Sequence, residues 1–369
     1  MPQAEQYEAK RKQLLKDGFH LLKKLASGGF ADAQYYLGVA YADDQKFDQA
    51  FAQFMAAAKR SHAPACHAVG AANEHGRGTK QSNKFAATYY KRAASAGYGP
   101  SMYRIGVAML RGEIGMKVDH KESLKWLKRA VAVADEENPH PLMQLAILYE
   151  HGLPPLVPVD ESYAVGLLLE AGELGYRPAQ YKLGFIYEYG RLGCAPNPQD
   201  SIYWYSQAAD QGDAEAQFAL AGWYLSGVSG LLPKSEAQAF RLTELAADQG
   251  LPKAMYALGY FLEMGMGTAY DPQRAWNYYT AAAQRGDTKG QQRVAQGPPI
   301  PGLRAQPVRV TPNTFLSGSP SQAMSQGVSV PTMPGLTPLN ANGSPALVAA
   351  AKLQPKDRRK SFLSIFGGR

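Results

Sequence analysis

Cysteine is scarce in this chain of 369 residues, where only Cys66 and Cys194 occur, far apart in the sequence. Two isolated cysteines give no disulfide framework and indicate a reducing compartment. No run of 18 consecutive apolar residues occurs, and no apolar segment follows the basic residues 10–12 near the amino terminus. The sequence therefore predicts neither a membrane-spanning helix nor a secretory signal peptide.

The chain also lacks a recognisable catalytic or metal-binding motif. Its seven histidines are scattered, with no His-Glu-x-x-His and no Cys-x-x-Cys, which are the spacings that zinc sites need. Gly76-Arg-Gly-Thr and Gly265-Met-Gly-Thr look like phosphate loops, but neither continues to Gly-Lys-Ser/Thr, and both fall at the same turn of a repeat. We therefore predict a protein that is not an enzyme and that uses no cofactor and no metal.

Positive charge is concentrated in the last fifth of the chain. The formal net charge is +8, and residues 297–369 supply +7 of it, because eight basic residues there face the single acid Asp357. The rest of the chain is nearly neutral. A nucleic-acid-binding protein needs basic residues clustered on its folded part, so we predict no nucleic-acid partner.

A repeated segment of the form Ala-x-Tyr-x-Leu-Gly is the main feature that the sequence does contain. Its clearest copy, Ala179–Gly190, is followed by Ser201–Gly212, and the apolar spacing gives each half one apolar helical face. Both halves stop at a glycine, which enters the left-handed conformation at little cost. Seven copies occur, about 32 to 40 residues apart, beginning at Ala33, Ala65, Ser101, Pro141, Ala179, Ala216 and Ala254.

Periods of this length are typical of stacked helical hairpins, since one hairpin cannot bury both of its faces. The predicted fold is all-α, a right-handed α-solenoid of stacked hairpins with an extended concave surface. We predict an amino-terminal helix in residues 1–29, an array of seven repeats with a short capping helix in residues 30–296, and a disordered Pro/Ser/Gly-rich basic tail in residues 297–369. The first helix resembles half a hairpin, which fits either a cap or, as we favour, a chain that begins inside a longer one.

Three sets of side chains recur at matched positions of the repeats. The first-helix residues that change most between repeats are predicted to contact a partner: Tyr36, Arg104, Gln144, Lys182 and Tyr260. Two aromatic columns are interpreted as packing between repeats: Tyr35, Tyr103, Tyr181 and Tyr256, and Tyr41, Tyr149, Tyr187 and Tyr224. A column of acids, Glu74, Glu150, Glu188 and Glu263, either grips a basic peptide or, as we favour, is solvated or hydrogen-bonds to the neighbouring hairpin turn.

The end of the tail combines basic and apolar residues. Lys356, Arg358, Arg359 and Lys360 would attract an anionic membrane surface into which Phe362 and Phe366 insert, and the alternative is a solvated tail. Ser361 follows Arg358-Arg-Lys and resembles a site for a basophilic kinase, where a phosphate would oppose the positive charge.

The repeat is seen most fully in Ala254-x-Tyr-x-Leu-Gly, Gly265-x-Gly-Thr, Asp271 and Ala275-Trp-x-Tyr-Tyr-x-x-Ala-Ala-x-x-Gly286. This unit resembles the Sel-one-like repeat, a relative of the tetratricopeptide repeat, and the resemblance covers about residues 29–290. The irregular connectors are similar to those of the fungal chitin synthase regulatory (activator) proteins: Trp126-Leu-Lys-Arg129, Pro139-His-Pro-Leu142, Glu188-Tyr-Gly-Arg-Leu-Gly-Cys194, Ala221-Gly-Trp-Tyr-Leu-Ser-Gly227, Leu231-Leu-Pro233 and residues 249–261.

The second resemblance implies a non-catalytic cytoplasmic subunit that binds the catalytic subunit of chitin synthase, recruits it to the septum or growth site and raises its activity. It also implies a peripheral location at the plasma membrane or septum through that partner, with septum or bud-neck scaffold proteins as further partners. Some members of that family end in a prenylated Cys-a-a-X box, whereas this chain ends Phe366-Gly-Gly-Arg369. Lipid anchoring is therefore not expected.

Other functions of the same repeat remain open at this point. The first alternative is a general signalling adaptor that serves another complex, such as a kinase pathway. A β-lactamase-like hydrolase of the cysteine-rich repeat families would need paired cysteines in each repeat, and two unpaired ones argue against it. The endoplasmic-reticulum degradation adaptor with this repeat would need a signal peptide and a membrane span.

Overall fold

The structure is a computed structural model, and it describes residues 2–298. Within this range the chain forms sixteen α-helices, and the only extended pairing is two isolated bridges, Leu153 with Val157 and Val228 with Leu232. The predicted tail contacts Lys356, Arg358, Arg359, Lys360, Phe362 and Phe366, and the candidate phosphorylation site Ser361, lie outside the described residues.

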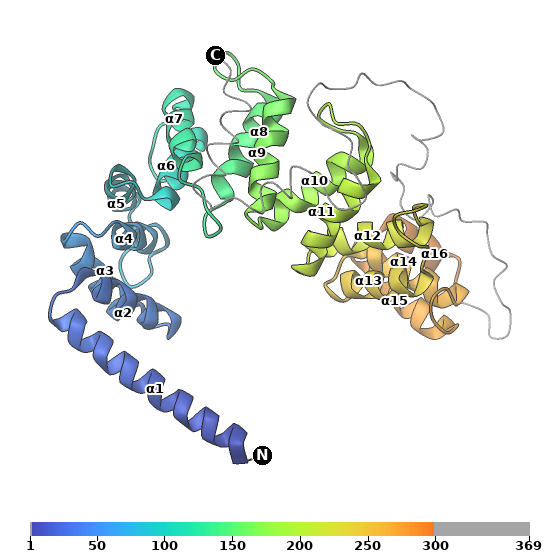
Figure 1. Ribbon diagram of the computed structural model, residues 1–369, viewed down its shortest axis with the longest axis horizontal. Coiled ribbons are helices and arrows are strands. Elements are labelled where there is room, and N and C mark those ends of the chain that lie inside the picture. Colours follow the sequence, from blue (N-terminus) through green and yellow to red (C-terminus); the bar gives the residue numbers. More distant parts are fainter. Residues whose placement is uncertain (1, 299–369) are drawn as a thin grey trace. The chain divides into compact units, whose positions relative to one another are not determined.

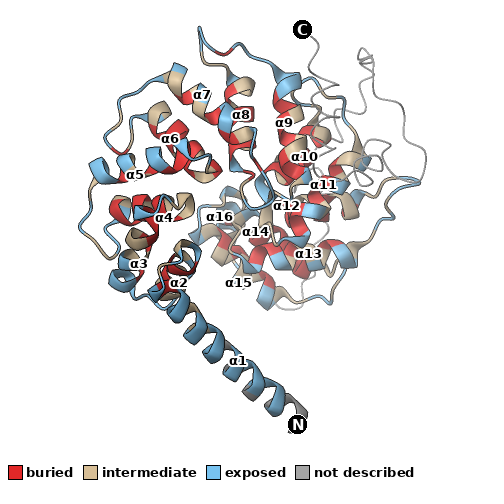
Figure 2. Cartoon of the chain, turned by 60° about the vertical axis from the view of Figure 1, so that its left-hand side comes forward, coloured by how far each residue is buried: buried red, intermediate tan, exposed pale blue. Residues whose placement is uncertain are grey.

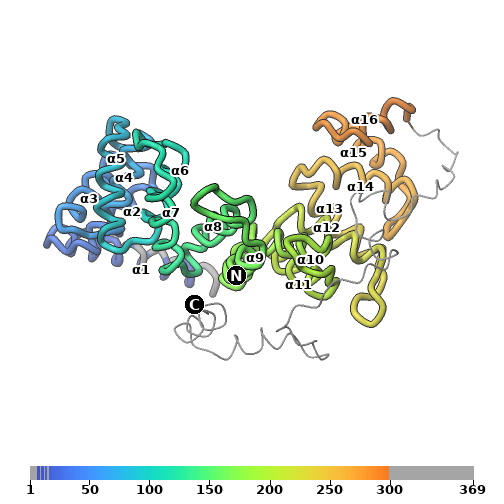
Figure 3. The backbone as a smooth tube through the Cα atoms, turned by 90° about the horizontal axis from the view of Figure 1, so that it is seen from above, coloured from blue at the N-terminus to red at the C-terminus, as the bar shows by residue number. Residues whose placement is uncertain are grey.

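Seven helical hairpins follow one another along the chain, and each helix contacts the next (Figures 1 and 3). The first helices of the hairpins are α2 (Ala31–Asp43), α4 (Ala63–His75), α6 (Gly99–Arg111), α8 (His140–His151), α10 (Arg177–Tyr189), α12 (Ala214–Ser226) and α14 (Pro252–Met264). The second helices are α3 (Phe47–Lys59), α5 (Asn83–Ser95), α7 (His120–Val131), α9 (Glu161–Glu173), α11 (Pro198–Asp210), α13 (Glu236–Asp248) and α15 (Pro272–Gln284). Helix α1 (Pro2–Ser27) precedes them and α16 (Thr288–Ala295) follows. The predicted solenoid of stacked hairpins is confirmed.

The helix ends follow from short-range sequence signals. Six of the second helices begin after a polar residue whose side chain accepts a backbone N–H of the first turn, as N-cap residues do: Ser82, Asp119, Asp160, Asn197, Ser235 and Asp271. Four first helices end at a left-handed glycine, Gly76, Gly112, Gly190 and Gly265. Gly152 and Gly227, at the ends of two further first helices, also have positive φ but an extended ψ, because the inserts that follow them fold back into the two isolated bridges.

The glycine of the Leu-Gly pair lies inside the first helix, where it does not end the helix but allows close contact with the second helix. A Cβ at Gly184 would stand 2.5 Å from Cδ1 of Tyr205, and the same close contact with a side chain of the second helix recurs at Gly38, Gly70, Gly106 and Gly259. The facing side chain is the eighth residue of each second helix: Phe54, Tyr90, Leu127, Tyr205 and Tyr279. The two hairpins with Ala146 or Ala221 in place of glycine have Leu168 and Thr243 at this eighth position, which are smaller than the Phe or Tyr that four of the five glycines face.

The core lies between neighbouring helices along the whole stack, where the buried residues gather (Figure 2). Its largest cluster joins α6 to α11 and includes Leu127, Leu142, Leu183 and Trp204. All eight tyrosines of the two predicted aromatic columns are partly buried against one of the core clusters. Their interpretation as packing between repeats is confirmed.

Helix α1 packs through one face only. Ala26 lies in one buried cluster with Ala33 and Leu37 of α2, and Phe19 and Leu22 pack against this cluster. Leu14 and Leu21 lie on the exposed side, and most of the helix is exposed (Figure 2).

The close approach at Gly38 can be tested by adding one methyl group. In Gly38→Ala the new Cβ would lie 2.6 Å from Cδ1 of Phe54. Overpacking costs about 1–3 kcal/mol, which the better helix propensity of alanine, worth about 1 kcal/mol, offsets only in part. We expect a lower free energy of unfolding in urea. The double variant Gly38→Ala with Phe54→Leu, which copies the pairing of Ala146 with Leu168, should recover part of the loss, and no recovery would contradict the size-matching argument.

Candidate functional site

The four acids Glu74, Glu150, Glu188 and Glu263 form the most distinctive polar feature of the stack, which we call the carboxylate ladder. Each is the second-to-last residue of a first helix, and in α4, α10 and α14 it is the twelfth residue of the helix. From this position a side chain reaches two neighbours. One is the eighth residue of the second helix in the same hairpin, and the other is the sixth residue of the following first helix.

Glu74 shows the complete arrangement. Its carboxylate accepts a hydrogen bond of 2.7 Å from the hydroxyl of Tyr90 and a second one from Nε of Arg104 at 3.2 Å, and Nη2 of Arg104 completes a two-pronged contact. Arg104 also donates to Glu113 at 2.7 Å. Burial acts to raise the pKa of the Glu74 carboxyl, but the hydrogen bonds from Arg104 and Tyr90 outweigh it and hold the pKa below its ordinary value.

Glu263 and Glu150 repeat this arrangement with variations. Glu263 accepts from the hydroxyl of Tyr279 at 2.7 Å and from Nη2 of Arg293 at 2.5 Å. Glu150 accepts from Nζ of Lys182 at 2.5 Å, and the eighth residue of its second helix is Leu168, which has no hydroxyl to donate. Arg104, Lys182 and Arg293 are each the sixth residue of their helix.

Glu188 departs from the other three. It is 7% exposed and accepts a hydrogen bond of 2.6 Å from the hydroxyl of Tyr205. The sixth residue of the following helix α12 is Ala219, so the position that holds a cation at the other three acids holds a methyl group here. Burial raises the pKa of the Glu188 carboxyl to about 7, against the opposing effect of hydrogen bonds from Tyr205 and Tyr189.

The favoured interpretation of the acids, that they are solvated or hydrogen-bond to the neighbouring hairpin turn, is wrong, because their partners are side chains and not the backbone groups of turns. They are tyrosine hydroxyls and the cationic side chains of the next hairpin. The sequence did contain a signal, since Glu74, Glu150 and Glu263 each precede an arginine or lysine by 30 to 32 residues.

The residues predicted to contact a partner lie on first helices, as expected. Tyr36 is 60% exposed, whereas Arg104 and Lys182 are engaged in the ladder, and Gln144 and Tyr260 are half-buried. Arg104 and Lys182 each pair with the acid near the end of the preceding first helix, so ion pairing inside the chain accounts for these two residues. Contact of these five residues with a partner stays a prediction.

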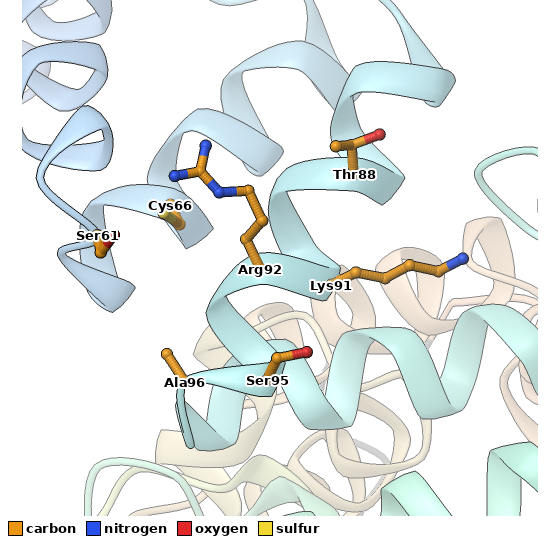
Figure 4. Close-up of a pocket in the computed structure, with 7 residues that line it drawn as sticks. All are labelled: Ser61, Cys66, Thr88, Lys91, Arg92, Ser95 and Ala96. Atoms are coloured by element: carbon orange, nitrogen blue, oxygen red, sulfur yellow. The ribbon is translucent and has the colours of Figure 1, made fainter.

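A separate surface cavity of about 630 Å³ lies beside α4 and α5. It is lined by Ser61, Cys66, Thr88, Lys91, Arg92, Ser95 and Ala96, and Arg92 extends towards α4 while Lys91 points the other way (Figure 4). Arg92 donates to the carbonyl oxygen of Ala58 at 3.0 Å. Burial raises the pKa of the Cys66 thiol, although Arg92 opposes this effect, so the thiol is not activated as a nucleophile.

Two further features of residues 2–298 bear on the chemistry. No group of three or more His, Cys, Asp or Glu side chains within this range is arranged to hold a metal ion. None of the helices in the same range has the length and apolar character that crossing a membrane requires. The recurring chemistry of the described residues is therefore pairing of side chains across repeats.

Comparison with known proteins identifies the repeat. The Sel1 repeat family matches residues 31–48, 63–98, 99–132, 142–176, 177–213, 214–251 and 252–287. A solved structure, the Sel1 repeat protein from Oxalobacter formigenes, superposes with a TM-score of 0.58 at 26% identity, covering 77% of this chain and 81% of that one.

Three relatives are fungal proteins that are longer than this chain. Chitin synthase regulator SKT5 from Malassezia restricta is 38% identical over 340 residues, which cover 90% of this chain and 23% of the relative. Chitin synthase regulator SKT5 from Saccharomyces cerevisiae is 36% identical and covers 75% of this chain and 41% of the relative. Activator of C kinase protein 1 from Saccharomyces cerevisiae is 30% identical, and the match covers 76% of this chain and 51% of the relative. The chain thus spans about a quarter to a half of the length of these relatives.

The ion pair of Glu74 with Arg104 can be tested by removing its cation. Arg104→Gln leaves a largely buried carboxylate without its counter-charge, and we expect a loss of about 1–3 kcal/mol in the free energy of unfolding, less than for a fully buried pair because both side chains keep some exposure. Adding Glu74→Gln to this variant should restore part of the stability in urea denaturation. If the double variant is no more stable than Arg104→Gln, the loss does not come from the unpaired charge.

The raised pKa of Glu188 predicts a stability that depends on pH. Its pKa is about 7 in the folded chain, against about 4.3 for an exposed glutamate. The folded state therefore binds more protons than the unfolded state between these values, so stability falls as the pH rises from about 4.3 to about 7 and is level above that. Relative to Glu188→Gln, the wild-type chain should lose about 3 kcal/mol of unfolding free energy across this range. Urea titrations at several pH values measure it, and a constant difference between the two chains would contradict it.

Proposed function

The chain belongs to the Sel1 repeat family, and from this premise we propose that it is a non-catalytic regulatory subunit of chitin synthesis that binds a chitin synthase catalytic subunit and recruits or activates it. The observation that carries the proposal is the similarity to the two proteins named chitin synthase regulator SKT5, which extends over 90% and 75% of this chain.

The geometry supports a role in binding rather than in chemistry. A stack of hairpins offers a continuous surface built from many repeats, and the titratable groups of its most distinctive polar feature are paired with one another. Septum or bud-neck scaffold proteins are further partners in this proposal. The location is cytoplasmic and peripheral, at the plasma membrane or septum through the partner.

The basic segment at residues 356–366 adds a second route to the membrane in this proposal. Lys356, Arg358, Arg359 and Lys360 supply four positive charges beside Phe362 and Phe366. Such a segment binds anionic lipid through charge and apolar insertion together. A phosphate on Ser361 would weaken that attraction.

The second candidate function is a signalling adaptor of the same fold. It is favoured by the similarity to Activator of C kinase protein 1, which is 30% identical over 318 residues. Affinity capture of the full chain separates the two candidates, because a chitin synthase among the captured proteins supports the first and a kinase pathway without it supports the second.

The proposed function predicts a loss of chitin in cells that lack the gene. Chitin synthase activity in membranes and chitin in the wall should both fall, and the full chain should restore them. A chain with Lys356, Arg358, Arg359 and Lys360 changed to glutamine should restore them less well if the basic segment aids delivery. Unchanged chitin and unchanged synthase activity in the deletion would overturn the proposal.

A further inference from the structure

The carboxylate ladder contains one position, Glu188, at which the sixth residue of the following helix is not a cation. We propose that the Glu188 carboxylate, at the junction of α10 and α12, is a recognition site for an arginine or lysine side chain of a partner polypeptide that enters over Ala219. The inference deepens the proposed function by giving the chemistry of the partner, and its link to a chitin synthase rests on that function.

Three other positions of the same chain provide the template. Glu74, Glu150 and Glu263 each receive a cation from the sixth residue of the following first helix: Arg104, Lys182 and Arg293. Nη2 of Arg293 reaches the carboxylate of Glu263 at 2.5 Å while the tyrosine hydroxyl approaches the same carboxylate at 2.7 Å. The stack therefore accommodates a guanidinium beside a tyrosine-bound carboxylate.

Glu188 has the rest of this arrangement. Tyr205 donates to it at 2.6 Å as Tyr279 does to Glu263. Ala219 stands at the cation position and is only partly buried. The methyl group takes up far less space than the arginine that the template accommodates, so a side chain arriving from outside can approach along this path.

Lys253 is the neighbouring cation: its charge acts to lower the pKa of the Glu188 carboxyl, but its ammonium group forms an ion pair with Glu215 and not with Glu188. Phe185 lies one helical turn before Glu188, is 38% exposed, and stacks on Tyr189 with ring centroids 4.6 Å apart. Aromatic faces next to a carboxylate suit a long cationic side chain, because they contact its apolar stem and attract its charge.

The energetics of the site favour a charged occupant. A carboxylate buried among apolar side chains is costly without a counter-charge, and a well-placed guanidinium returns part of that cost through charge-assisted hydrogen bonds. An arginine or lysine that completes Glu188 therefore gains more from this site than from an exposed glutamate on the same surface.

The first test selects peptides on the intact protein. A library of random peptides of about twelve residues, displayed on phage, is selected on the full chain and rescreened on Ala219→Arg, which fills the site from within. The matched control is Ala68→Arg, which adds the same charge at the sixth residue of α4, where the preceding first helix carries Ala42 in place of an acid.

We expect selected peptides to share one arginine or lysine, and to bind Ala219→Arg and Glu188→Gln at least about tenfold more weakly than wild type or Ala68→Arg. Selection of no peptides, peptides without a shared cation, or equal binding to Ala219→Arg would overturn the proposal. Peptides that bind only after Lys356, Arg358, Arg359 and Lys360 are changed to glutamine would show that this chain's own basic segment is the occupant, which also overturns it.

The second test asks whether the site accepts a cation at all. Ala219→Arg should raise the melting temperature of the full chain by about 2 °C or more, and should not do so in the Glu188→Gln background. A lower melting temperature in both backgrounds would overturn the geometry. Neither test uses chitin synthase, so the site can be rejected while the proposed function stands, and the reverse.

Discussion

Close contact between the two helices of a hairpin is the constraint on which the rest of the structure depends. A large side chain from the eighth position of the second helix, such as Tyr205, presses against a first helix that has no Cβ at the facing residue, Gly184. This approach lets small residues such as Ala179 and Ala208 become fully buried around the contact. It also fixes where the tyrosine hydroxyl emerges, which is beside the acid at the end of the same first helix.

The tyrosine consequently links packing inside a hairpin to polar contact between hairpins. Its ring fills the space above the glycine, and its hydroxyl donates to Glu74, Glu188 or Glu263. Each of these acids faces the following first helix, so the residue at one position of that helix decides whether the carboxylate is neutralised. The stack is thus assembled from a repeated packing unit and an ion pair that only some junctions possess.

Much of the fold follows from the sequence, because the repeat period, the apolar faces and the polar N-caps are all local signals. The hairpins, the short last helix at Thr288–Ala295 and the packing of the aromatic columns could be predicted in this way. The pairing of Glu74 with Arg104 could not be read as easily, since it joins residues 30 apart that a single repeat does not contain. The residue type at the positions of Arg104 and Lys182 changes between repeats, as it would on a surface that binds a partner. The acid of the preceding repeat that faces each of them gives the actual reason, an ion pair inside the chain.

The carboxylate ladder also makes the junctions between hairpins unequal, because only some of them contain one of its ion pairs. Its ion pairs join the second hairpin to the third, the fourth to the fifth and the seventh to α16. A repeat array behaves as a chain of units whose cooperativity depends on the strength of each junction. The other junctions, including the one where Glu188 faces Ala219, depend on packing and on different polar contacts, such as the ion pair of Arg177 with Asp213. Polar reinforcement therefore alternates irregularly along the array, so a load applied at one end would be shared unequally among successive junctions.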